Sequence, residues 1–269
     1  MAGAASMTRT RETAQYPGAA LRALAVTATV AIPSLLVAPS PVGTGPELSF
    51  LVGAAAGLMV LFEYGARTPA LVDFRFAPPL NRLRFATFVI ALAAATAAAA
   101  SPAAGRLGLT VAEAMAGPAS PVDLAAWAVT RDSAPGPDPV LRAAGALTLL
   151  AALTCLAGAG AWIWFGAWPG DPERFNRWIN LPTFEPSDEG DAAAWLKRQG
   201  GLAALTGLAL PVALTGLGAA ATRLFAADLF AAPLAQIWAA AIWAGVPACV
   251  LLRAMALLKL ARIARRDVS

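Results

Sequence analysis

Apolar residues gather into six long runs along this chain of 269 residues, and short polar stretches separate the runs. The hydrocarbon core of a bilayer is about 30 Å thick, and a helix crosses it in about twenty residues. The runs have that length, so they predict six transmembrane helices in an all-α polytopic bundle. The expected spans are 23–42, 48–64, 85–104, 143–164, 202–221 and 234–252, and the last helix is expected to continue to about residue 260.

The basic residues between the runs predict how this bundle is oriented. Of the 20 Lys and Arg residues, 16 fall on the side that holds both termini, and only Arg106, Arg131, Arg142 and Arg223 fall on the other. Short cytoplasmic segments carry the excess of basic residues in membrane proteins. Both termini are therefore expected in the cytoplasm. The strong use of Ala, Gly, Pro and Arg is typical of a high-GC bacterium, which indicates the bacterial inner membrane.

The predicted organisation is one membrane domain with two tails. Residues 1–22 are expected to form a disordered cytoplasmic tail, residues 23–260 the six-helix domain, and residues 261–269 a basic cytoplasmic tail. Two connections within the domain are long, an outer one at 105–142 and a cytoplasmic one at 165–201. The remaining connections are too short to hold a further domain.

The first apolar run has a second interpretation, as a signal peptide that is removed. A basic tail precedes it, and Pro33 shortens its continuous apolar part. The following sequence VAPSPVG has no clear small-x-small cleavage site, which favours retention of the run as a membrane span.

The outer connection contains its own helix signals. Asp123 follows Pro121 and precedes an apolar stretch, which is a helix-start pattern, and Trp127 suits an interfacial depth. We expect one or two helices that lie against the outer face of the bundle. They could serve as a structural cover or as a lid over a binding cavity.

Composition excludes several classes of function. The chain is 58% hydrophobic, 13% charged and contains no histidine. Without imidazole there can be no His-ligated haem, no His-containing zinc site and no Ser-His catalytic pair. Cys155 and Cys249 lie within apolar runs and are too few to form a metal or redox centre by themselves. We expect no catalytic residue, cofactor or metal, and no nucleic-acid binding, since topology alone accounts for the net charge of +4.

The cytoplasmic connection carries the best candidate for an interaction surface. Asp171, Pro172 and Glu173 form a helix-start pattern. Apolar side chains then follow at positions i, i+3 and i+4, and two arginines face away from them. The candidate surface consists of Arg174, Phe175, Arg177, Trp178 and Ile179, and it predicts a short amphipathic helix in the headgroup region.

Acidic residues follow in the same connection. Asp188, Glu189 and Asp191 could bind a divalent cation through carboxylate oxygens, but their spacing matches no EF-hand loop. Acids at a helix start, with Lys197 and Arg198 near its end, complement the helix dipole. The dipole interpretation is favoured over the metal site.

Small residues in the second span form a GxxxG motif at Gly53 and Gly57. Such a face allows two helix backbones to approach closely, either within one chain or between two copies. Packing within the chain is the favoured interpretation, because Ala and Gly are abundant here. Pro33, Pro211 and Pro247 lie inside spans and predict local kinks.

The middle of every predicted span lacks charged residues, which disfavours a coupled ion transporter. The leading expectation is a non-enzymatic accessory, assembly or stabilising subunit that packs against a membrane-protein partner. The alternative is a small carrier or channel for a neutral or lipid-like substrate. A third possibility is an enzyme that uses the carboxylates around residues 185–191.

The leading expectation predicts a closed core with no continuous polar passage between the two faces. The contrary observation would be a water-sized passage at mid-depth, beside a kink at Pro211 or Pro247. Such a passage would be lined by threonines from the set Thr148, Thr154, Thr206 and Thr215.

Overall fold

A computed structural model describes residues 2–37, 46–65, 80–117, 120–129, 138–166, 168–169, 181, 192–225 and 229–266, with side chains described from residue 17 to residue 265. Within these ranges helices are the only regular secondary structure, which confirms the predicted fold class. Six of the helices are long and apolar enough to cross a membrane. They are α1 (Ala2–Leu36), α2 (Pro46–Gly65), α3 (Leu80–Ala100), α6 (Pro139–Phe165), α8 (Ala192–Leu224) and α9 (Pro233–Arg266).

The N-terminal prediction differs from the structure. Residues 1–22 were expected to form a disordered tail, but α1 is helical from Ala2, and its membrane-length apolar part is Pro17–Leu36. Residues 2–16 are rich in Ala, Met, Arg, Glu and Gln, which are strong helix formers. Adding such residues to an existing helix is much easier than starting a new one.

Prolines mark where many of these helices begin. Pro46, Pro139 and Pro233 are the first residues of α2, α6 and α9, and Pro121 is the first residue of the short helix α5 (Pro121–Val129). Proline suits this position, because the first helical N–H has no partner inside the helix. At α6 the preceding Asp138 completes the start, since its carboxylate accepts hydrogen bonds from the N–H groups of residues 140 and 141 at 2.8 and 3.0 Å.

A proline also explains why the third span ends earlier than predicted. Residues 85–104 were expected to form one helix, but α3 ends at Ala100 and α4 (Pro102–Ala114) begins beyond it. Ser101 between them has an extended backbone (φ −122°, ψ 122°), and its hydroxyl accepts a hydrogen bond from the N–H of Ala104. A residue before proline is disfavoured in the α conformation, which makes the break.

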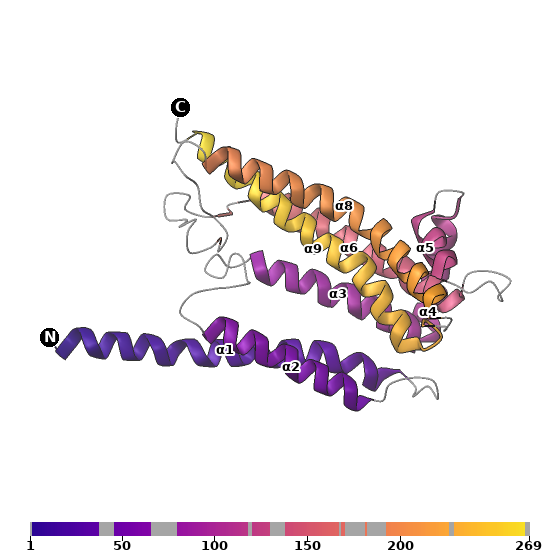
Figure 1. The fold of residues 1–269 in the computed structure, drawn as a ribbon, viewed down its shortest axis with the longest axis horizontal. Helices are drawn as coiled ribbons and strands as arrows, with labels where there is room; N and C mark the ends of the chain where they lie inside the picture. The colour runs from indigo at the N-terminus through magenta and orange to yellow at the C-terminus, as the bar shows by residue number, and fades with distance from the viewer. Residues whose placement is uncertain are drawn as a thin grey trace. The chain divides into compact units, whose positions relative to one another are not determined.

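The chain divides into two compact units, and α1 and α2 form the first as a hairpin (Figure 1). The GxxxG residues Gly53 and Gly57 lie on the face of α2 that contacts α1. A Cβ atom at Gly53 would lie 2.9 Å from the carbonyl oxygen of Thr27, and one at Gly57 would lie 2.9 Å from that of Ala23. The Thr27 hydroxyl also donates to the carbonyl of Gly53 at 3.0 Å. This motif therefore packs two helices of the same chain.

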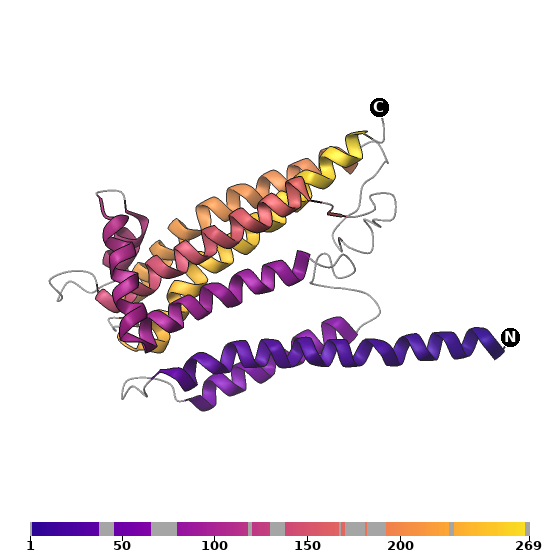
Figure 2. The same ribbon diagram turned by 180° about the vertical axis from the view of Figure 1, so that it is seen from behind.

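The second unit is built around α9, with α8 and α6 packed along it (Figures 1 and 2). Glycines form the α8–α9 contact, since a Cβ at Gly200 or Gly207 would come within 3 Å of Leu258 or Leu251 side-chain atoms. Helix α3 contacts α9 where Gly245 faces Phe88. Close backbone approach is the usual way to pack helices in a membrane.

The predicted outer connection contains α4 and α5 (Pro121–Val129). Helix α4 packs on α6 where Gly108 meets Ala143, and α5 packs on both α6 and α8. Both short helices lie at the end of the bundle where α6 begins, away from the C-terminal end of α9 (Figure 1). The expectation of helices packed on the bundle is therefore met.

Candidate functional site: an apolar pocket beside α5

An apolar pocket of about 260 Å³ lies between α5, α6, α8 and α9. Its lining comes from 122–129 of α5, 141–145 of α6, 214–221 of α8 and 239–243 of α9, together with Phe230. Among the described helices, α6 and α8 both pack extensively on α9 but not on each other. The pocket is the space that remains between α6 and α8 over α9, and α5 covers it.

The pocket occupies only one end of the unit. Its lining extends to Leu214 on α8 and Trp243 on α9, each ten residues from the helix end beside α5. Ten helical residues span about 15 Å, which is about half of the hydrocarbon thickness. The pocket is therefore about as deep as one leaflet is thick.

The polar side-chain groups of the lining satisfy one another. Thr215 donates its hydroxyl to the carbonyl of Pro211 at 2.8 Å. The indole N–H of Trp243 points at the same place, 3.0 Å from the Thr215 hydroxyl oxygen and 3.1 Å from the Pro211 carbonyl. Since these donors are already used, the pocket presents a hydrocarbon surface to anything that enters it.

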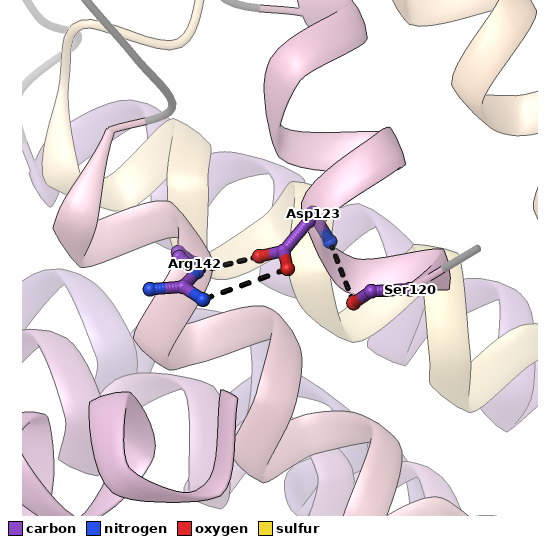
Figure 3. A network of polar contacts seen from close by, with 3 residues as sticks. All are labelled: Ser120, Asp123 and Arg142. Atoms are coloured by element: carbon purple, nitrogen blue, oxygen red, sulfur yellow. Dashed lines mark hydrogen bonds and ion pairs between the residues drawn. The ribbon is translucent and has the colours of Figure 1, made fainter. Parts of the chain in front are cut away.

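An ion pair between Arg142 and Asp123 fastens α5 to α6, as Figure 3 shows. The Arg142 guanidinium on α6 donates to the Asp123 carboxylate on α5, with N–O distances of 2.5 and 3.5 Å. The Ser120 hydroxyl accepts a hydrogen bond from the N–H of Asp123 at 3.3 Å, and this contact caps the beginning of α5. Arg142 and Asp123 are each adjacent in sequence to a lining residue, Leu141 and Val122. The ion pair therefore holds the edge of the pocket wall.

The residues predicted to form an interaction surface, Arg174, Phe175, Arg177, Trp178 and Ile179, lie outside the described residues, as do Asp188, Glu189 and Asp191. Those predictions remain predictions. Gly53 and Gly57 lie in the α1–α2 hairpin, whereas the pocket belongs to the other unit.

The four threonines named as possible passage residues are not brought together. Thr148 is buried and donates its hydroxyl to the carbonyl of Ala144, while Thr154 and Thr206 are exposed. Thr215 alone reaches the pocket, and its hydroxyl is engaged with Pro211. The pocket adjoins the predicted kink at Pro211 but is apolar rather than polar.

The described residues offer few groups that could bind a metal ion or carry out redox chemistry. No group of three or more His, Cys, Asp or Glu side chains that could hold a metal ion occurs among them. Cys155 and Cys249 are free thiols, and Cys249 donates to the carbonyl of Arg84 at 3.2 Å. This contact ties α9 to α3 and needs no reactive role.

Sequence reasoning considered a binding cavity under the outer helices but could not locate the pocket, and it missed the ion pair. Arg142 and Asp123 are 19 residues apart, on two different helices, so no local spacing connects them. The only signal was the helix-start pattern that placed α5 on the bundle.

Comparison with known protein families, with curated proteins and with solved structures found no match. The geometry of this chain therefore carries the functional proposal.

Proposed function

We propose that this chain is a non-enzymatic integral protein of a bacterial inner membrane, and that it is an accessory, assembly or stabilising subunit of a larger membrane complex. Its partner would be another membrane protein, with the lipid bilayer as surrounding solvent. The division of basic residues, 16 on one side and four on the other, supports termini in the cytoplasm.

Exposed apolar faces of α2 and of α8, each considered within its own unit, carry this proposal. Only 17% of the most apolar stretch is buried in each of these helices, compared with 56% in α9. Large side chains cover the exposed faces, and Phe62 and Val212 are 72% and 76% exposed. Both helices use glycines for their contacts within the chain. Each thus keeps apolar faces that partner helices can pack against.

The alternative is a carrier or channel for a neutral or lipid-like substrate, and the pocket beside Pro211 favours it. A carrier must expose its site to both faces of the membrane in turn. The pocket reaches about half of the hydrocarbon thickness, which supports binding within one leaflet more than passage across the bilayer. For this reason the accessory role remains the leading proposal.

Purification from native membranes in a mild detergent tests the proposal. We expect a membrane-protein partner in fixed stoichiometry with this chain, measured by size-exclusion chromatography and mass spectrometry. Phe62→Ala and Val212→Ala probe which outward face the partner uses, with Trp127→Ala on α5 as an exposed control. Recovery of the chain alone, with lipid and no stoichiometric protein, would overturn the accessory role.

The orientation has its own test. In a background without Cys155 and Cys249, a single cysteine at Ser133 should react with an impermeant thiol reagent from the periplasm. A single cysteine at Ser187 should react only after the inner membrane is permeabilised. Reaction on the opposite sides would refute the proposed topology.

A further inference from the structure

We propose that the pocket between α5, α6, α8 and α9 binds one acyl chain of a membrane lipid, taken from the leaflet that contains α5. This site needs no protein partner, so it goes beyond the proposed function and can hold or fail independently of it.

The chemistry of the lining selects a hydrocarbon ligand. Its walls are apolar side chains from four helices, and the hydroxyl of Thr215 and the indole N–H of Trp243 are both engaged at Pro211. An ordered water in a cavity needs two to four polar partners, and apolar cavities without them stay dry and bind apolar molecules. A ligand here must therefore bring no polar groups into the pocket.

The volume suits part of a lipid chain. An engineered apolar cavity of about 150 Å³ binds benzene, which has six carbon atoms. By that ratio the 260 Å³ pocket has room for about ten carbon atoms. A chain segment of that length matches a pocket confined to one leaflet.

The pocket is also accessible from the surface that spanning helices present to lipid. Two lining residues at its edge, Leu217 on α8 and Ile242 on α9, are 69% and 39% exposed. Leu217 lies on the same helix as the outward-facing Val212. An acyl chain can therefore enter sideways from the bilayer without crossing a polar barrier.

An acyl chain fits this site better than a polypeptide segment. A peptide carries backbone N–H and C=O groups, and a helix with its side chains is about 10 Å wide. The pocket has no free donor among its lining side chains to pair with such groups. Acyl chains have no polar groups and surround the protein at high concentration, which favours occupancy by mass action.

Photocross-linking in liposomes tests the site. The full chain is reconstituted in phosphatidylcholine that includes a small fraction of phosphatidylcholine with a diazirine on one acyl chain. Labelled peptides are then mapped by mass spectrometry. We expect labelling at Gly145, Ala240 and Trp243, which are buried or half-buried residues of the lining, besides labelling of outward residues such as Phe62.

Two matched pairs of variants connect that labelling to the pocket. Ala221→Phe fills the pocket from α8, whereas Ala220→Phe adds the same ring at the neighbouring exposed position outside the lining. We expect the first to lower labelling at the three lining residues about tenfold, because displacing even two methylenes from an apolar site has that effect. The second should leave labelling unchanged. Ala125→Phe on α5, with Leu124→Phe as its control, repeats the test should Ala221→Phe fail to fold.

Two results would overturn the proposal. One is a wild-type protein that is labelled on its outward faces but not at Gly145, Ala240 and Trp243. The other is labelling at these residues that survives both filling substitutions. Loss of the protein partner in the co-purification experiment would leave this labelling unaffected, so the two proposals fail separately.

Discussion

The two ends of the α6, α8 and α9 bundle are held together differently. Away from α5, Gly200 of α8 meets Leu258 of α9, and Gly160 of α6 meets Met255 of α9. A Cβ atom on either glycine would lie 2.9 Å from the nearest of these side-chain atoms. At the other end, Gly145 and Gly218 face α5 instead of a spanning helix, through Val122 and Val129. At the first end, which we call the closed end, glycines bring α6 and α8 into close contact with α9. At the other end they make room for the short helix α5.

Polar contacts follow the same division. At the closed end the Lys259 ammonium on α9 donates to the carbonyls of Ile163 and Gly166, at the end of α6, and Arg262 lies 4.2 Å from the ring centre of Trp164. These carbonyls have no partner within their own helix. At the end beside α5, the Arg142–Asp123 pair attaches a nine-residue helix. The Lys259 contacts pair carbonyls at the end of the long helix α6, whereas the Arg142–Asp123 pair attaches the short helix α5 to α6.

The largest expected effect is at the closed end. Gly200→Leu should lower the free energy of unfolding by about 3 kcal/mol, because the added side chain must displace Leu258 and overpacking carries a cost of that order. Gly201→Leu is the control, since nothing lies within 4 Å of its Cβ position. Unfolding in detergent micelles, followed by tryptophan fluorescence, measures both. Equal losses in the two variants would show that the glycine contact does not close this end.

Lys259→Met should lower the free energy of unfolding by about 2 kcal/mol. It leaves carbonyls at the end of α6 without their donor, while methionine keeps an apolar stem of similar length. Lys197→Met removes an exposed lysine near the beginning of α8 and should change stability little. Hydrogen exchange at residues 160–166 gives a local readout. Unchanged exchange there in Lys259→Met would separate this lysine from the end of α6.

The Arg142–Asp123 ion pair should stabilise the attachment of α5 to α6 by about 1 kcal/mol. A double-mutant cycle of Arg142→Gln and Asp123→Asn isolates that coupling energy, and the pair is partly exposed, which keeps it modest. Faster hydrogen exchange of α5 should accompany each single change. Arg223→Gln, which alters an exposed basic residue of α8, is the control. A coupling energy near zero would mean that apolar contacts alone hold α5 in place.

Sequence predicted the parts of this fold that a bilayer dictates. Six apolar runs gave six long helices, because membrane thickness sets both their length and their composition. Helix starts were also readable, as Pro121 before Asp123 shows. The end of the third span was not, because the apolar run continues past Ser101 and hides the break that Pro102 makes.

The pocket could not be predicted, because no local pattern describes space left between helices. Its lining comes from four segments separated by up to about a hundred residues, each of which looks like any other part of an Ala- and Leu-rich span. Gly53 and Gly57 illustrate the same limit. The motif predicted a close helix contact, yet the partner helix, α1, became evident only from the structure.

The smallest expected effect lies in the pocket wall and sharpens the comparison of the two ends. Trp243→Phe removes the indole donor but leaves the Pro211 carbonyl bonded to the Thr215 hydroxyl, so the loss should be about 0.5 kcal/mol, at the low end for a hydrogen bond. Trp127→Phe changes an exposed tryptophan of α5 and should cost less. The same unfolding measurement compares them. If α5 is the main element that holds this end together, Trp243→Phe will lower the free energy of unfolding far less than Gly200→Leu does. A comparable loss would mean that the polar cluster at Pro211 fastens α8 to α9 as firmly as the glycine contacts do.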